Sequence, residues 1–190
     1  MLSLRSIGFD DIERVVMSTS DIIESIKFNL KQLTRVDLGY PLGDNVVRPA
    51  SDADSKIKLE EPFAKWLAEL YSVCDGLSLP DVHVGYFVKP AAKIKVPHRS
   101  TEPETLLLSG SELRVLPFGS TGGGDLFAVE ATEGSVFILP PGPVKNGVYD
   151  GRGTKARKLT ESISQFLELL LSDITAFVKS ENQHVFLTKR

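Results

Sequence analysis

The chain contains one cysteine, Cys74, among 190 residues. A single cysteine excludes an intramolecular disulfide and any cysteine-based zinc cluster that this chain would form alone. Long hydrophobic runs are also lacking, and the first residues, MLSLRSIGFDDIERVV, reach acidic side chains before any apolar stretch of signal-peptide length. We therefore expect a cytoplasmic protein without a membrane anchor.

The sequence has little excess charge of either sign. Its 22 Lys and Arg residues are set against 25 Asp and Glu residues, which gives a formal net charge of −3. No overall basic field is present to attract nucleic acid or anionic lipid, so binding to either is not expected. With 42% hydrophobic and 25% charged residues, the composition is typical of a soluble globular protein.

Sequence motifs of catalysis or metal binding are missing as well. The three histidines, His83, His98 and His184, lie far apart in the sequence, and none belongs to a His-x-x-x-His or Glu-x-x-His pattern. There is no Gly-x-Ser-x-Gly elbow, and Cys74 lies on the apolar face of a predicted helix with no histidine near it in sequence. We therefore predict neither an enzyme nor a cofactor or metal site.

Periodicity predicts helices in three places. An apolar stripe at three- and four-residue spacing indicates a helix over 19–33, with Ser20 or Asp21 available as N-cap. A second helix begins at Pro62 and stops at Gly76, and a third covers 160–178 and opens with a capping box, Ser162 and Gln165. Residues 37–58, rich in Gly, Pro, Asp and Ser, are predicted to be a long surface connection.

Four short segments are predicted to be successive antiparallel strands, since each is rich in β-branched or aromatic residues and bounded by Gly or Pro. They are residues 81–90, 113–119, 125–130 and 134–140. The expected fold is α+β, a mainly antiparallel sheet of four or more strands flanked by helices on one side. We divide the chain into an accessory segment (1–58), the α+β domain (59–178) and a tail (179–190) that adds an edge strand or stays loose.

The stretch LPFGSTGGGDLFAVE, residues 116–130, contains three consecutive glycines. A phosphate-binding loop would need Gly-Lys-Ser/Thr leading into a helix, whereas here Asp125 leads into a strand. The glycines favour a tight hairpin turn, for which they supply positive φ angles while Asp125 bonds the amides of the turn. The alternative is a loop that cradles a ligand.

The same stretch, followed by GSVFIL and SISQFLELLL, resembles the C-terminal half of SMI1/KNR4 domains, the SUKH superfamily. LYSVCDGLSLPDVHVGYFVKP, residues 70–90, is similar to the helix end and first strand of that family. The resemblance covers about residues 60–178. It implies a non-catalytic interaction module, because bacterial members are mostly immunity proteins that neutralise a toxin and fungal members act as scaffolds in cell-wall signalling.

Loops at one end of the predicted sheet are the expected site of recognition, because loops on a rigid scaffold carry binding residues. We place there the turn 119–125, the loop 140–153 and Asp75-Gly76. The candidate partner-binding residues are Asp75, Tyr86, Ser120, Asp125 and Tyr149.

We expect a protein partner at this end, for which a toxin domain is one candidate, and a homodimer is a second possibility. The alternative function is a small-molecule or nucleotide sensor that uses the glycine turn and two basic segments, 89–99 and 145–158.

Overall fold

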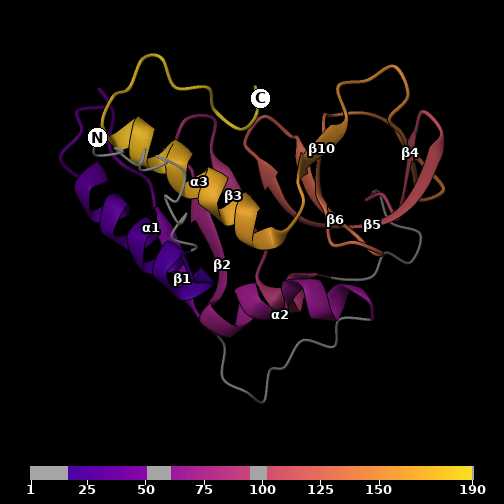
Figure 1. The fold of residues 1–190 in the computed structure, drawn as a ribbon. Helices are drawn as coiled ribbons and strands as arrows, with labels where there is room; N and C mark the ends of the chain where they lie inside the picture. The colour runs from indigo at the N-terminus through magenta and orange to yellow at the C-terminus, as the bar shows by residue number, and fades with distance from the viewer. Residues whose placement is uncertain (1–16, 51–60, 95–101, 190) are drawn as a thin grey trace, which may run out of the picture.

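A computed structural model describes residues 17–50, 61–94 and 102–189. In this part of the chain a curved, mainly antiparallel sheet has helices packed on one of its faces, which confirms the predicted α+β class (Figure 1). The helices are α1 (Thr19–Leu33), α2 (Phe63–Val73) and α3 (Ile163–Val178), with a short 3-10 turn, η2 (Ala91–Lys93).

The strands follow the chain in ten segments among the described residues. They are β1 (Val46–Pro49), β2 (Cys74–Leu79), β3 (Tyr86–Val88), β4 (Thr105–Leu108), β5 (Ser111–Thr121), β6 (Leu126–Glu130), β7 (Val136–Leu139), β8 (Val144–Lys145), β9 (Val148–Asp150) and β10 (Arg157–Thr160). The four predicted strands correspond to β3, β5, β6 and β7.

Strand β5 organises the sheet, because three other strands pair with it. Its first residues pair with β4, its last with β3, and its middle with β6, with an irregularity between Pro117 and Gly119. From β3 the sheet continues through β2 to the edge strand β1, and from β6 through β7 to β10. From β4 it continues to β9 and β8, and the β4–β9 pair is parallel.

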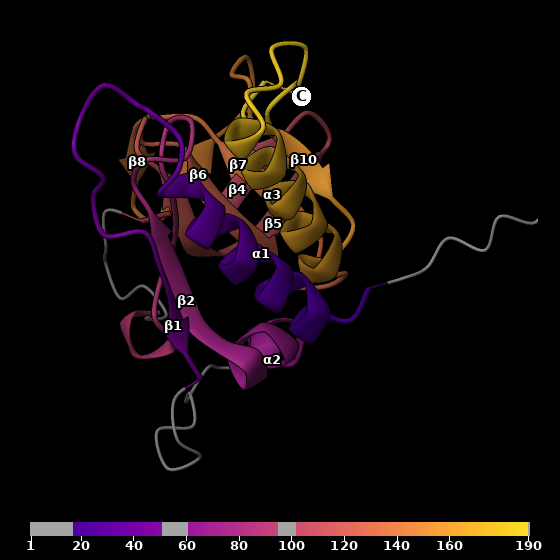
Figure 2. The same ribbon diagram turned by 90° about the vertical axis from the view of Figure 1, so that its left-hand side faces the viewer.

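Two apolar cores lie on the two sides of this sheet. The larger one packs the three helices against the sheet, and Figures 1 and 2 show α1 and α3 side by side across it. The smaller one joins β4 and β9 to β5, β6 and β7, and contains Leu106, Val115, Ala128, Phe137, Leu139 and Tyr149. The helices cover one face of the sheet, as predicted. The opposite face is covered in part by strands β4 and β9 and is not wholly exposed to solvent.

The helices begin where local capping chemistry allows. Ser162 is the N-cap of α3, and its Oγ accepts a hydrogen bond from the Gln165 amide (3.2 Å), as predicted. The Gln165 side chain accepts from the amide of Glu161 rather than of Ser162. In α1 the prediction of Ser20 or Asp21 as N-cap was wrong, because Ser18 caps the helix one residue before Thr19.

The prediction for residues 37–58 was incomplete. Within this stretch β1 forms and pairs with β2, while residues 51–60 lie outside the described part. Helix α1 shares the larger core with α2 and α3, so the boundary drawn near residue 58 does not separate an accessory segment from that core.

Helix α2 ends earlier than predicted. It stops at Val73 and the chain passes directly into β2 at Cys74. Gly76 therefore lies inside a strand, with φ +78°, and a Cβ there would come 2.4 Å from the carbonyl oxygen of Val88. A close approach of β2 to β3, and not the end of a helix, requires this glycine.

The C-terminal tail neither adds a strand nor stays loose. Residues 181–189 form turns, and Leu187 is fully buried in the larger core. Its backbone N–H donates to the carboxylate of Asp173 on α3 (2.9 Å). The tail is therefore an integral part of the fold.

Candidate functional site

The glycine-rich stretch forms the predicted hairpin turn between β5 and β6. The Thr121 amide donates to the carbonyl of Asp125 (2.9 Å), and the Gly124 amide donates to the carbonyl of Thr121 (3.2 Å). Of the three consecutive glycines only Gly124 has positive φ, at +89°. The Asp125 carboxylate accepts from the Thr121 hydroxyl (2.8 Å) and not, as predicted, from the amides of the turn.

Other loops lie against this turn. The Gly122 amide donates to the carbonyl of Gly85 (3.1 Å), and a Cβ on Gly124 would come 3.3 Å from the ring of Pro141. We use the name loop end for the surface formed by residues 80–85, 121–125 and 140–142, together with the C-terminal tail, residues 181–189, which meets residue 83. The predicted gathering of the glycine turn and the loop after residue 140 is thus observed.

Two of the five predicted binding residues lie at or beside the loop end with part of their surface accessible. They are Ser120, paired with Phe87 of β3, and Asp125. Tyr149 is buried beneath this surface, where its hydroxyl donates to the carbonyl of Pro140 (2.8 Å). Tyr149 therefore supports the loop from inside the smaller core.

The other two predicted residues are placed differently. Asp75 lies at the opposite end of β2, where its carboxylate accepts from the Ala91 amide (2.7 Å). Tyr86 is only 1% exposed and directs its hydroxyl into the larger core, towards Asp173. The structure therefore does not bring Asp75 to the loop end and leaves Tyr86 in the interior.

A buried carboxylate is the main polar feature that the sequence analysis missed. Asp173 of α3 has no exposed surface, and its Oδ2 atom accepts both from the Tyr86 hydroxyl (2.7 Å) and from the Leu187 amide (2.9 Å). The Nε2 atom of His184 lies 2.7 Å from its other oxygen. Asp173 thus joins α3, β3 and the tail. A buried carboxylate needs such hydrogen-bond partners, because without them its burial would cost much free energy.

Two of the histidines that lie far apart in the sequence meet at this place. The ring of His83 stacks on Phe186 with centroids 3.9 Å apart and an interplanar angle of 7°, and His184 meets the same ring edge-on at 4.8 Å. His98 lies outside the described residues. One sequence signal was available, because Asp173 falls on the apolar stripe of α3, three residues after Leu170.

The environment of His83 disfavours its charged form. Burial lowers the pKa of His83 below its ordinary value of 6.5, and the positive charges of Lys189 and His184 act in the same direction. The negative charge of Asp173 acts the other way but is outweighed. The Nε2 atom of His83 is buried and has no hydrogen-bond partner among the residues described.

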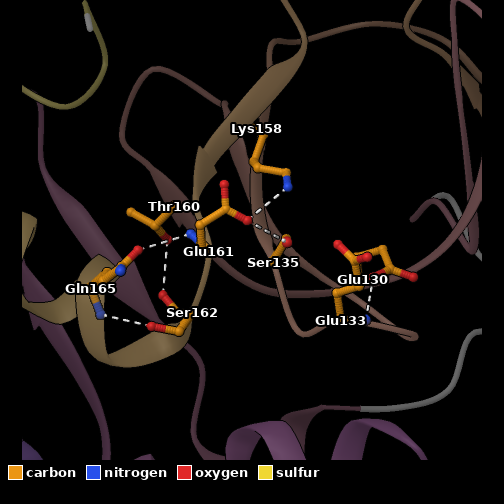
Figure 3. A network of polar contacts seen from close by, with 8 residues as sticks. All are labelled: Glu130, Glu133, Ser135, Lys158, Thr160, Glu161, Ser162 and Gln165. Carbon is orange, nitrogen blue, oxygen red and sulfur yellow. Dashed lines mark hydrogen bonds and ion pairs between the residues drawn. The ribbon is translucent and has the colours of Figure 1, made fainter.

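A second polar network joins β10 to the start of α3 (Figure 3). The Glu161 carboxylate accepts from Lys158 (2.8 Å) and from the Ser135 hydroxyl (3.4 Å). Glu130, almost fully buried, accepts from the amides of Thr132 (2.6 Å) and Glu133 (2.7 Å) in the β6–β7 turn. The Glu130 carboxylate satisfies amides of a turn, and the Glu161 carboxylate joins β10 to Ser135 before β7, so both have a structural role.

The predicted basic segments are partly neutralised within the chain. Lys89 pairs with Glu102 (2.6 Å). In the second segment, Arg152 pairs with Asp150 (2.7 Å), and this hydrogen bond lowers the pKa of the Asp150 carboxyl to about 2. Lys95 and Arg99 lie outside the described residues. Lys93, Lys145 and Lys155 have exposed side chains.

Across residues 17–50, 61–94 and 102–189 no group of three or more His, Cys, Asp or Glu side chains is placed to hold a metal ion. No helix in those ranges is both long enough and apolar enough to cross a bilayer. Comparisons of the chain with protein-family models, with curated proteins and with solved structures gave no match.

Proposed function

We propose that the protein is a non-catalytic protein-binding module, an immunity-type protein or a regulatory scaffold, whose partner surface is the loop end. The observation that carries this proposal is a pair of exposed valines. Val84 and Val185 are 41% and 53% exposed, and each is the sequence neighbour of one residue of the His83–Phe186 stack. The β2–β3 loop and the C-terminal tail, which the stack joins, thus each expose an apolar side chain.

The hydrogen bonds around this surface favour recognition. Residues 121–125 are tied to one another and to Gly85, so little conformational freedom remains to be lost on binding. Loops held in this way on a sheet are common positions for binding residues. The net charge of −3 is compatible with a basic partner such as a nuclease toxin, and the resemblance to SMI1/KNR4 domains points to the same kind of function.

The test is affinity capture of partners from the native host with tagged protein. Three chains are compared: the wild type, the double variant Val84→Asp with Val185→Asp, and the control Phe28→Asp. Phe28 is 61% exposed on α1. We expect one stoichiometric partner to be retained by the wild type and the control and lost by the double variant, with circular dichroism unchanged. A partner that carries a toxin domain would show that the protein is of the immunity type and not a regulatory scaffold.

Retention of the same partner by the double variant would refute the loop end as the binding surface. A thermal-shift panel of nucleotides and sugar phosphates tests the sensor alternative on the same protein. A ligand present at a hundred times its dissociation constant would stabilise the protein by about 2.7 kcal/mol. Such a shift, in a protein that captures no partner, would replace our proposal with that alternative.

A further inference from the structure

Several contacts between the C-terminal tail and the rest of the fold gather at one place, beside the buried side chain of Leu187. Asp173 accepts from the Leu187 amide and pairs with His184. The Leu187 carbonyl accepts from Arg157 Nη2 (3.2 Å), and the Phe186 ring stacks on His83. Figure 1 shows the tail turning back from the end of α3 to reach this place.

His83 is the residue of the β2–β3 loop that meets the tail. It adopts a left-handed backbone conformation, with φ +54°, which non-glycine residues rarely occupy. Its ring lies nearly parallel to the ring of Phe186, and its Nε2 atom is buried without a partner in the described part of the chain. A neutral imidazole fits this position, because an uncharged ring loses far less hydration on burial than a charged one.

We propose that the C-terminal tail is an acid-released latch, docked while His83 is neutral and detached when His83 takes up a proton. Protonation would turn the buried Nε2 into a charged donor with no acceptor. Detachment of the tail removes Phe186 from the imidazole and returns the ring to water, which restores the hydration of the charge.

The charged groups that act on His83 belong to α3 and to the tail, and the Tyr86 ring of β3 lies with its centroid 6.4 Å from that of His83. Asp173 on α3 attracts a proton to His83, but its oxygens already accept from Tyr86 of β3 and from the tail. Lys189 and His184, both on the tail, repel a positive charge on His83. A cation stacked on the Phe186 ring gains some attraction, which opposes the effect of burial. The repelling groups all move away when the tail detaches.

The direction of the pH effect follows from proton linkage. The pKa of His83 in the docked state lies below its ordinary value of 6.5, and in the detached state it returns towards that value. The detached state therefore binds the proton more tightly, so docking is strongest above about pH 6.5 and weakens as the pH falls below it. Each unit of difference between the two pKa values gives up to a tenfold loss of docking.

Amide hydrogen exchange in the full-length chain tests the latch. The Leu187 amide is the probe, since it is protected only while it donates to Asp173. After correction for intrinsic exchange rates, we expect its protection to fall severalfold, and by at most about tenfold, between pH 7.5 and 5.5, while the Phe127 amide in β6 keeps its protection. Protection of Leu187 that does not change with pH would overturn the proposal.

Two substitutions separate the histidines. His83→Gln removes the titrating group, so the loss of Leu187 protection on acidification should disappear. His184→Gln removes the pair with Asp173 and should lower Leu187 protection at every pH, with the acid-induced loss retained. An acid-induced loss that persists in His83→Gln, or that disappears in His184→Gln, would refute the assignment to His83.

A direct titration remains informative if His83→Gln itself loosens the tail. The substitution Leu187→Asn places an uncharged polar group at a buried position, so it should detach the tail in the full-length chain without adding a charge near His83. The His83 ring signals, followed by NMR against pH, should then titrate at higher pH than in the wild type. Identical titration midpoints in the two chains would overturn the latch, because docking and protonation would not be linked.

Discussion

At the scale of single residues, Asp173 decides the arrangement around the tail. A carboxylate without exposed surface is tolerated because Tyr86 and Leu187 donate to its Oδ2 atom and His184 lies against its Oδ1 atom. The sequence indicated that an acidic residue interrupts the apolar stripe of α3. It did not indicate the partners, because Tyr86 lies 87 positions away in the chain and no local pattern links the two residues. The hairpin turn was predictable because its bonds span four residues.

The first prediction concerns the hydroxyl group of Tyr86. Tyr86→Phe leaves the ring in place but removes one donor from a carboxylate that stays buried. We expect the free energy of unfolding to fall by about 1–3 kcal/mol. Tyr40→Phe is the matched control, since Tyr40 is largely exposed, and its effect should stay within about 0.5 kcal/mol. Urea unfolding measures the free energy of unfolding of both variants. Equal losses in the two would show that the Tyr86 hydroxyl does not stabilise the buried carboxylate.

At the scale of elements, the helices were more predictable than the strands. The helical stripes of α1 and α3 recur within each segment, so their boundaries follow from local residues. Strand β1 was missed because it is four residues long, ends in Pro49 and depends on β2 for its hydrogen bonds. The abrupt change from α2 to β2 was also missed, because the glycine that resembles a helix stop serves a close strand contact.

The second prediction concerns the start of α3. Ser162→Ala removes the side-chain oxygen that accepts from the Gln165 amide. We expect a loss of about 1 kcal/mol in the free energy of unfolding, as for other N-caps. Ser164→Ala, in the first turn of the same helix, is the control and should change stability by less than about 0.5 kcal/mol. Thermal unfolding distinguishes the two, and a reversed order would show that another group caps the helix.

At the scale of the whole molecule, β5 connects the two cores. Leu116 and Phe118 of this strand belong to the larger core, and Val115 to the smaller one. Loss of packing in one core therefore disturbs β5, and the other core depends on the same strand. We expect the two cores to unfold together as one cooperative unit.

The third prediction uses the reactivity of the Cys74 thiol to measure how often this cooperative unit opens. Its side chain is fully buried in the larger core, and burial raises the pKa of the thiol. We expect a thiol reagent to label the folded protein at least about a thousandfold more slowly than a free cysteine, because labelling requires global opening. In denaturant the rate should reach that of free cysteine. Rapid labelling of the folded protein would show that the larger core opens locally.

The packing of α1 against α3 has a consequence for synthesis on the ribosome. Helix α1 is made before α3, and α3, which begins at Ile163, covers part of its apolar face. At about 5–20 residues per second, the interval between the two is on the order of ten seconds. Throughout that time Ile22, Ile23 and Ile26 lack their final neighbours. The nascent chain therefore leaves an amphipathic segment exposed, to which chaperones can bind, until α3 emerges.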